Sequence, residues 1–359
     1  MLEINVPKEI HKPPQAMEFI IDVLHHLGGG AMDWKQKYWF GAVLWPSSLE
    51  IVSIEGSIYF FIRTPAKLAA LVKSTIYSQF PQVEVSEVDD YTKHVPDYNK
   101  HQDSWELYAA DYKLAGEDFL PIKTYIDYEL DKNVGKLDEN QKIDPLTPML
   151  EFLSTLGPGE QIWIQYIIRG DAKSDWRKRA QAFIDDKMEN GKSIDENETF
   201  QMLKLSPGEQ DQVKGVQRSL GKHAFETVVR AVYIAKKKQE NPGVKGFFKG
   251  PIFKPFTSLY FNGIRKNDDT GFDWVWEDVT GKRDPSKKRR FYNDYVNRES
   301  FYRPLWKRLN FLWYDNNKPT IFTTEELATL FHLPGSVSET RALERMDATK
   351  SQPPQDLPI

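Results

Sequence analysis

The chain has 359 residues, of which 40% are hydrophobic, 13% aromatic and 28% charged, a composition typical of a globular protein with substantial apolar cores. It contains no cysteine, which excludes disulfides, thiolate catalysis and metal sites with cysteine ligands. The N-terminus lacks the apolar segment of a secretory signal, and no run of about 18 apolar residues predicts a membrane helix. We therefore expect a cytoplasmic protein, held at the inner face of the membrane only through partners.

The formal net charge of −4 conceals an uneven distribution of charged residues. Residues 84–144 contain sixteen Asp and Glu against seven Lys, a net charge of −9. Residues 281–310 contain ten Lys and Arg against three Asp and Glu, a net charge of +7. Such a split indicates either charged partners or two regions that face each other.

The first part of the chain predicts a small α+β unit. Residues 1–15 are polar and contain proline, which indicates an extended arm. Apolar residues at helical spacing predict helices at 16–27 and 65–80. Between them, residues 49–65 predict two strands with a turn near Glu55 and Gly56. Further strands are predicted at 83–88, 105–114 and 120–130.

A similar order of elements follows. Residues 144–156 predict a helix with Asp144 as its N-cap and Pro145 in its first turn. Strong strands are predicted at 161–170 and 224–235, separated by a charged helical insertion that includes 175–188, and a proline-containing helix is predicted within 251–264.

Helix–strand–strand–helix therefore occurs twice, although the two copies share little sequence. This order predicts an α+β fold of two ferredoxin-like units with antiparallel sheets, followed by a basic, partly helical C-terminal region. The expected divisions are an arm at 1–15, a first unit with an acidic β-hairpin at 16–143, a second unit at 144–265, a basic and aromatic region at 266–335, and a linker-like tail at 336–359.

The clearest local signal is "IFTTEELATLFHLPG", residues 321–335. Thr323 followed by Glu326 predicts a capping box, with Phe322 and Leu327 at the positions of a hydrophobic staple. Leu327, Leu330 and Phe331 form the expected buried face, and His332 is expected to pack or cap near the end of the helix.

Known catalytic motifs are incomplete in this sequence. "NGKS" at 190–193 ends like a phosphate-binding P-loop, but Asp186 occupies the position of the required first glycine and the preceding segment predicts a helix. "TGKR" at 280–283 has no Ser or Thr after its lysine. No G-x-S-x-G nucleophile motif is present. We expect no cofactor and no catalytic site.

Histidines and paired acids give weaker signals. His25 and His26 are adjacent, so on a helix they point about 100° apart and do not readily share a metal ion. His94, Asp97 and His101 lie in one polar loop, for which a solvated loop is the simpler interpretation. Adjacent acids such as Asp89–Asp90 and Glu325–Glu326 are expected to face water. A hydrolase that uses carboxylates of the acidic region is the weakest of the alternatives.

The basic region around 281–310 is a candidate nucleic-acid interface. Basic side chains neutralise phosphates, and interleaved aromatic side chains stack on bases. The alternative is an amphipathic helix from Pro285 to about Leu309, whose charges form its solvated face. That alternative is favoured. The candidate contact residues are Lys287, Lys288, Arg289, Arg290, Arg298, Arg303, Lys307 and Arg308.

The series "IYSQFPQVEVSEVDDY", "DPLTPMLEFLSTLGPGEQIWIQYIIRG", "FETVVRAVYIA", "TTEELATLFHLPG" and "PPQDLPI" resembles an uncharacterised domain of a known protein family. That domain precedes the motor in HerA/FtsK-like ATPases of the type IV secretion or conjugation coupling type, found in ultra-small bacteria. The resemblance extends from about Ala16 to Ile359, and the order of the motifs carries it.

The motor's nucleotide-binding segments have no counterpart in this sequence, so the resemblance implies no ATP-binding residue. It implies a non-enzymatic accessory or assembly domain of a DNA-translocating ATPase, either a separate subunit or part of a longer chain. The implied partners are the motor in cis or in trans, DNA, other secretion components, and further copies of the chain assembled through the motor. The alternative function is a stand-alone nucleic-acid-binding protein that uses residues 281–310.

Overall fold

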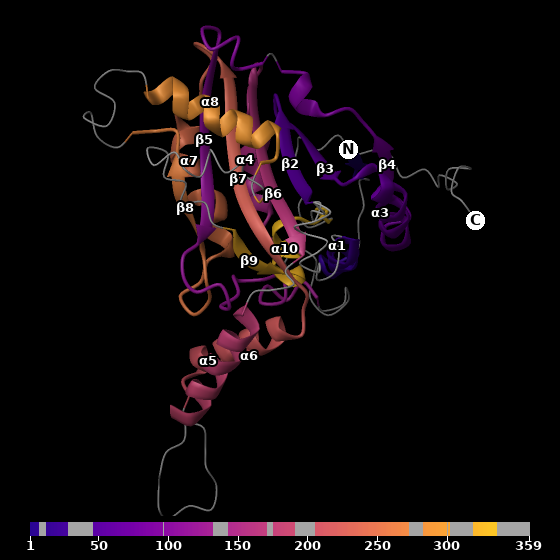
Figure 1. Cartoon of the computed structure of the whole chain (residues 1–359), viewed down its shortest axis with the longest axis vertical. Helices are drawn as coiled ribbons and strands as arrows, with labels where there is room; N and C mark the ends of the chain where they lie inside the picture. Colours follow the sequence, from indigo (N-terminus) through magenta and orange to yellow (C-terminus); the bar gives the residue numbers. More distant parts are fainter. Residues whose placement is uncertain are drawn as a thin grey trace, which may run out of the picture.

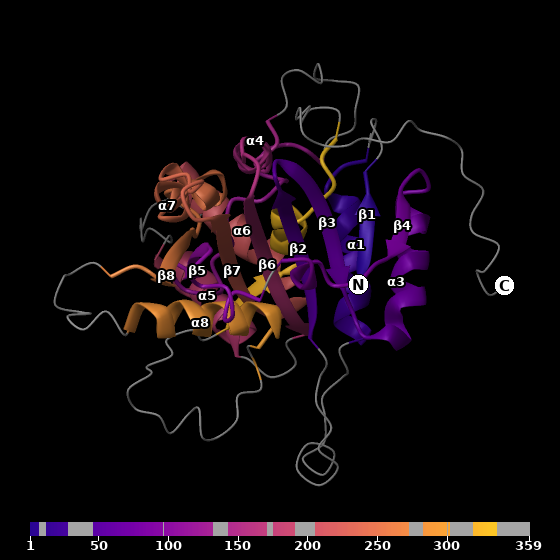
Figure 2. The same ribbon diagram turned by 90° about the horizontal axis from the view of Figure 1, so that it is seen from above.

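The computed structural model describes residues 1–6, 12–27, 46–95, 97–131, 143–170, 175–190, 205–272, 283–299, 301 and 319–335. These residues form an α+β fold around one nine-stranded antiparallel sheet, with helices on both faces (Figures 1 and 2). The predicted α+β class is therefore confirmed. No helix among the described residues is long and apolar enough to span a membrane.

The sheet is continuous from one end of the molecule to the other. Its strands run in the order β4-β1-β3-β2-β6-β7-β5-β8, and β9 pairs with the start of β7. The strand bounds are β1 Leu2–Asn5, β2 Ser47–Ile54, β3 Ser57–Arg63, β4 Glu84–Glu87, β5 Trp105–Leu114, β6 Glu160–Gly170, β7 Ala224–Lys236, β8 Ile264–Asp269 and β9 Thr320–Thr323.

The chain passes through the sheet in two similar halves. The first half runs β1-α1-β2-β3-α3-β4 and the second runs β5-α4-β6-β7-α7-η3-β8, with the α5–α6 pair inserted between β6 and β7. The helix bounds are α1 Gln15–Leu27, α3 Ala66–Gln79, η1 Tyr91–Lys93, α4 Thr147–Ser154, α5 Trp176–Asn190, α6 Pro207–Leu220, α7 Gly243–Phe248, η3 Pro251–Phe256, α8 Arg283–Val296 and α10 Thr324–Leu330.

The two halves meet where β2 pairs with β6, for example at Ile51 opposite Ile164. The predicted boundary at residue 144 therefore falls within one sheet and does not separate two sheets. Two separate ferredoxin-like units are not confirmed.

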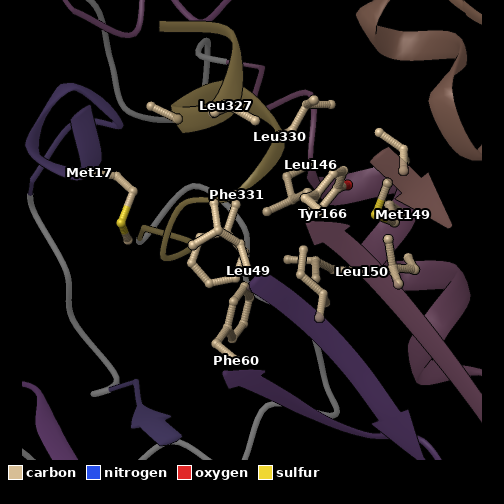
Figure 3. Packing of buried hydrophobic residues seen from close by; sticks show 14 of the residues in the cluster. Met17, Leu49, Phe60, Leu146, Met149, Leu150, Tyr166, Leu327, Leu330 and Phe331 are labelled. Atoms are coloured by element: carbon tan, nitrogen blue, oxygen red, sulfur yellow. The ribbon is translucent and has the colours of Figure 1, made fainter. Parts of the chain in front are cut away.

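One face of the sheet carries the larger core. Buried side chains of α1, α3, α4, α7 and η3 pack there in one cluster with β1, β2, β3 and β6. The helix α10 lies inside this layer, where Leu327, Leu330 and Phe331 meet residues from both halves of the chain (Figure 3). Every residue of α10 is buried. This element joins the helical layers of the two halves.

The opposite face and the lower end of the sheet carry two smaller cores. On the opposite face, α8 and η1 pack over β2, β5, β6 and β7 around Trp163 and Tyr295. At the lower end, α5 and α6 project from the sheet as a two-helix arm, which packs around Trp176 and Val216 (Figure 1). The predicted insertion helix at 175–188 is confirmed as α5.

The hairpin between β2 and β3 depends on its glycine. Glu55 and Gly56 have φ values of 52° and 90°, as in the tight turns that connect antiparallel strands. A Cβ atom on Gly56 would lie 3.1 Å from the carbonyl oxygens of Ser154 and Leu156. The predicted turn is confirmed.

We expect Gly56→Ala to lower the free energy of unfolding by about 1–2 kcal/mol, because alanine is strained in the left-handed region. Urea denaturation measures this loss. Gly246→Ala in α7 is the matched control, since its new Cβ meets nothing within 4 Å. We expect that control to be neutral or stabilising. Equal losses in the two variants would contradict the assignment.

Three predicted elements differ from the structure. Residues 2–5 of the predicted arm form β1, which pairs with β3 and β4 inside the sheet. The strand predicted at 120–130 is a series of turns. The helix predicted within 251–264 is limited to the 3-10 helix η3, whose Pro255 cannot donate a backbone hydrogen bond.

The turns at 120–130 have a physical cause. The backbone N–H groups of Ile122 and Tyr125 donate to the side chains of Glu326 and Thr329 on α10. Lys123 donates to the carbonyl of Phe256. Because these donors are satisfied by α10 and η3, the segment covers α10 and does not extend the sheet.

Candidate functional site

A row of polar side chains crosses the sheet on the face that carries α8. Cross-strand pairing aligns Glu50 with Gln165, Gln165 with Arg230, and Arg230 with Asp111. Asp111 in turn pairs with Asp268 at the sheet edge. Glu50, Gln165, Arg230 and Asp111 are all buried. We call these five residues the polar row.

The helix α8 lies along the polar row and contacts it at successive strands (Figure 1). Arg290 donates to Asp268 at 3.1 Å on β8. Arg230 donates to the carbonyl of Asp294 at 3.0 Å, and Gln165 approaches the carbonyl of Tyr295 at 3.5 Å. Just beyond α8, Arg298 binds Glu50.

Arg298 binds two carboxylates at once. Its Nε and Nη2 donate to the two carboxylate oxygens of Glu50 at 2.9 and 3.1 Å. Its Nη1 and Nη2 donate to Asp90 at 2.6 and 3.2 Å. The side chain of Arg298 is 3% exposed and that of Glu50 is 0% exposed. This is a buried, charge-assisted network with bidentate geometry.

Hydrogen bonds complete the environment of the Glu50 carboxylate. Ser48, Tyr91 and Gln165 donate to it at 2.6, 2.8 and 3.0 Å. Burial alone would raise the pKa of Glu50, but the Arg298 guanidinium and these donors outweigh it and hold the pKa below the ordinary value. Glu50 is therefore a carboxylate that neutralises Arg298, not a proton donor.

The geometry at Arg298 also explains where α8 ends. The N–H of Glu299 bonds to the carbonyl of Asp294, and the N–H of Arg298 bonds to that of Tyr295. This is the pattern of a Schellman motif, in which glycine usually occupies the left-handed position. Arg298 holds that position with φ 53°. The helix predicted from Pro285 to about Leu309 therefore ends at Val296, and Tyr302, Leu305 and Leu309 lie outside the described residues.

The basic run of α8 is largely paired with acidic side chains. Lys287 lies 2.9 Å from Asp268, and Lys288 lies 2.5 Å from Glu106 and 3.0 Å from Asp284. Arg290 shares Asp268 with Lys287. Among these four residues, Arg289 is the exposed one.

The uneven charge distribution is thus partly an internal match. Acidic residues of 84–144, among them Asp90 and Glu106, form ion pairs with basic residues of 281–310. Arg298 is too deeply buried to reach a phosphate in this arrangement. The candidate contacts Arg303, Lys307 and Arg308 lie outside the described residues.

A second polar network surrounds the start of α10. The predicted capping box between Thr323 and Glu326 is confirmed. Glu326 is buried, and burial raises its pKa to about 7, although backbone and hydroxyl donors oppose the shift. The expectation that Glu325 and Glu326 face water is wrong, because both are nearly fully buried.

Glu325 anchors the α5–α6 arm to the body. Arg218 at the end of α6 donates to both Glu325 oxygens at 2.9 and 3.1 Å, and Thr124 donates at 2.6 Å. Nearby, Lys222 donates to Glu18 of α1 at 2.6 Å. These bonds join the base of the arm to α10 and α1.

His332 follows α10 and forms a buried pair with Asp144. Its Nε2 lies 3.2 Å from both oxygens of Asp144, and its Nδ1 lies 3.0 Å from the carbonyl of Ala328. Burial lowers the pKa of His332, but the Asp144 carboxylate and the carbonyls outweigh burial and raise it overall. The predicted packing role is confirmed. Asp144 does not cap α4 directly, since Leu146 is the N-cap.

The His332–Asp144 pair predicts a pH-dependent contribution to stability. The folded pKa of His332 is raised, so the contribution is fully present below the unfolded value of about 6.5 and is lost as the pH rises through the folded pKa. Asp144→Asn removes the charge. We expect it to lower the free energy of unfolding more at pH 6 than at pH 8, as measured by urea denaturation. An equal loss at both values would contradict the ion pair.

Metal and phosphate sites find no support among the described residues. No group of three or more His, Asp and Glu in these ranges could hold a metal ion. The rings of His25 and His223 are stacked, with their centroids 4.5 Å apart. Stacked rings do not direct their nitrogen atoms at a common metal ion. The structure does not describe the side chain of His26. It also does not describe residues 191–193, the GKS part of the NGKS stretch.

The polar row is the feature that sequence reasoning missed. Three members, Glu50, Gln165 and Arg230, are charged or amide residues in largely apolar stretches, such as Glu50 in "LEIVS" and Arg230 in "VVRAVY". One polar residue at an inward position indicates a buried partner, because an unpaired buried charge is costly. The pairing across five strands needs the register, which no local pattern provides.

Comparison with known proteins finds no matching family model and no matching curated protein.

Proposed function

We propose that the chain is a non-enzymatic assembly domain associated with a HerA/FtsK-like, DNA-translocating ATPase of the type IV secretion kind. The motif series in the sequence suggests the association. The observation that carries the assembly role is the position of "TTEELATLFHLPG". Its Glu325, Phe331 and His332 contact both halves of the chain and the arm, so the most distinctive motif serves the architecture and not a reaction.

We also infer that each half is a ferredoxin-like unit. The first half has β-α-β-β-α-β order and sheet order β4-β1-β3-β2, and the second half has the mirrored order β6-β7-β5-β8. The two units would join edge to edge through β2 and β6. A double unit of this kind offers a rigid platform for assembly. It contains no nucleotide-binding loop among the described residues.

The distribution of polar groups supports a non-enzymatic role. The two largest polar networks, at Arg298 and at Glu325, consist of groups that bind one another. An active site needs a base or nucleophile aimed at open space. In these two networks, the carboxylates of Glu50 and Glu325 are bonded to structural partners.

The α5–α6 arm is the surface that we expect to contact the motor. It projects beyond the sheet (Figure 1), and its residues Lys178, Asp185 and Asp186 are exposed. Its base is fixed by Arg218 and Lys222, so a force on the arm would reach α10 and α1 directly. Exposed charges on a fixed helix pair suit a specific electrostatic contact.

The test is co-expression with a HerA/FtsK-like motor encoded in the same genome, followed by affinity purification. We expect a stoichiometric complex that Asp185→Lys with Asp186→Lys weakens. The matched control is Lys67→Glu with Lys73→Glu on α3, which changes two charges away from the arm. We expect no ATP hydrolysis by the chain alone. Turnover above a blank by the isolated chain would contradict the non-enzymatic role.

The second candidate is a stand-alone nucleic-acid-binding protein that uses residues 281–310. The exposed Arg289 and the net positive charge of residues 281–310 favour it. The internal ion pairs of Lys287, Lys288, Arg290 and Arg298 weigh against it. Binding of duplex DNA that weakens steeply with salt, and that is lost when residues 287–290 are changed to Ala, would support it.

A further inference from the structure

We propose that α8 is a separately opening cover: an ion-paired helix that leaves the polar row while the rest of the sheet stays folded. This opening of α8 is independent of the proposed association with a motor. The two helices α8 and α10 differ in how much of their surface is buried. All seven residues of α10 are buried, whereas α8 buries Phe291, Tyr292 and Tyr295 out of fourteen residues.

Apart from these three side chains, the first turns of α8 are attached mainly by ion pairs at the edge of the helix. We call Lys287–Asp268, Lys288–Glu106 and Arg290–Asp268 the rim pairs, and Asp268 and Glu106 the rim acids. The side chains of Lys287 and Lys288 are 20% and 14% exposed, and their partners Asp268 and Glu106 are 37% and 24% exposed. Partly exposed ion pairs are each worth little and weaken in salt. Loss of these rim pairs removes much of what holds the first two turns of α8, up to Arg290.

The surface beneath α8 is suited to contact with water. Glu50, Arg230 and Asp111 are charged, and the Oε1 atom of Gln165 has no hydrogen-bond partner among the described residues. Opening would hydrate these groups, and this offsets part of the cost of exposing the small apolar cluster. A permanently closed interface gains more from apolar side chains at such positions.

The asymmetry of the attachments defines a hinge. Arg298 holds the C-terminal end of α8 by four charge-assisted bonds to Glu50 and Asp90. The first two turns of α8, up to Arg290, are held mainly by the partly exposed rim pairs. The helix would therefore lift from its N-terminal side, expose Asp111 and Arg230 first, and release Lys287, Lys288 and Arg290 for other contacts.

Hydrogen exchange of backbone amides tests this device. In the wild-type chain we expect the amides of Phe291 and Tyr292 to exchange about tenfold faster in 1 M than in 50 mM NaCl. Amides of Trp163 and Val232 in the central strands should not respond. Glu106→Gln with Asp268→Asn removes the rim acids, and we expect it to reproduce the fast exchange of α8 at 50 mM NaCl.

Asp185→Asn with Asp186→Asn is the matched control, because it changes the net charge equally but lies on α5. We expect this control to exchange like the wild type. Exchange of α8 at the rate of the central strands, in either salt concentration, would show that α8 opens only with global unfolding and would overturn the proposal. Fast exchange of α8 in the α5 control would attribute the effect to net charge and would also overturn it.

Discussion

Arg298→Met is expected to lower the free energy of unfolding by about 3–5 kcal/mol. The change removes the guanidinium but leaves the Glu50 carboxylate buried without its hydrogen-bonded cation. An uncompensated buried charge costs more than the intact pair contributes. Equilibrium urea denaturation monitored by circular dichroism measures the loss.

The double variant Glu50→Gln with Arg298→Met separates the charge from the packing. The glutamine can still accept hydrogen bonds from Ser48 and Tyr91, but it carries no charge. We expect it to recover more than half of the stability that Arg298→Met loses, because removing both charges of a buried pair costs far less than removing one. A double variant as unstable as the single one would contradict the electrostatic account.

Phe331→Ala is expected to lower the free energy of unfolding by about 3–5 kcal/mol, since a fully buried aromatic side chain leaves a large cavity. Phe331 is 0% exposed and packs edge-on against Phe60 of β3, with ring centroids 5.8 Å apart. Figure 3 shows it between Met17, Leu49 and Leu330. Thermal and urea unfolding measure the effect.

Phe19→Ala on α1 is the matched control for Phe331→Ala. Phe19 is 56% exposed, so the same substitution removes little buried surface. We expect a change within about 0.5 kcal/mol. If Phe331→Ala were as mild as this control, the segment at 321–335 would not be part of the core, and its role in joining the two halves would be wrong.

Local signals predicted much of the fold because they act within one element. The capping box at Thr323 and the turn at Glu55–Gly56 depend on neighbouring residues, and both are present in the structure. Alternation and β-branched residues likewise predicted β6 and β7. Prediction was weaker where distant segments decide. The strand β1 is four residues long, and its partners β3 and β4 determine it.

The candidate site shows the same limit. The sequence predicted that the acidic and basic regions either bind partners or face each other, and the structure shows facing pairs such as Lys288 with Glu106. It did not predict which pairs form, because these depend on the cross-strand register. It also placed Glu325 and Glu326 in water. Their burial follows from Arg218, Thr124 and Ile122, which lie about a hundred or two hundred residues away in the chain.

The central claim is that this chain assembles with a motor and performs no reaction itself. Sedimentation velocity of the purified chain mixed with a HerA/FtsK-like motor from the same genome, with ATP hydrolysis followed in the same samples, tests it most directly. We expect a defined complex in which the motor hydrolyses ATP, and no ATP hydrolysis by the chain alone. Independent sedimentation of the two proteins, or ATP hydrolysis by the isolated chain, would contradict it.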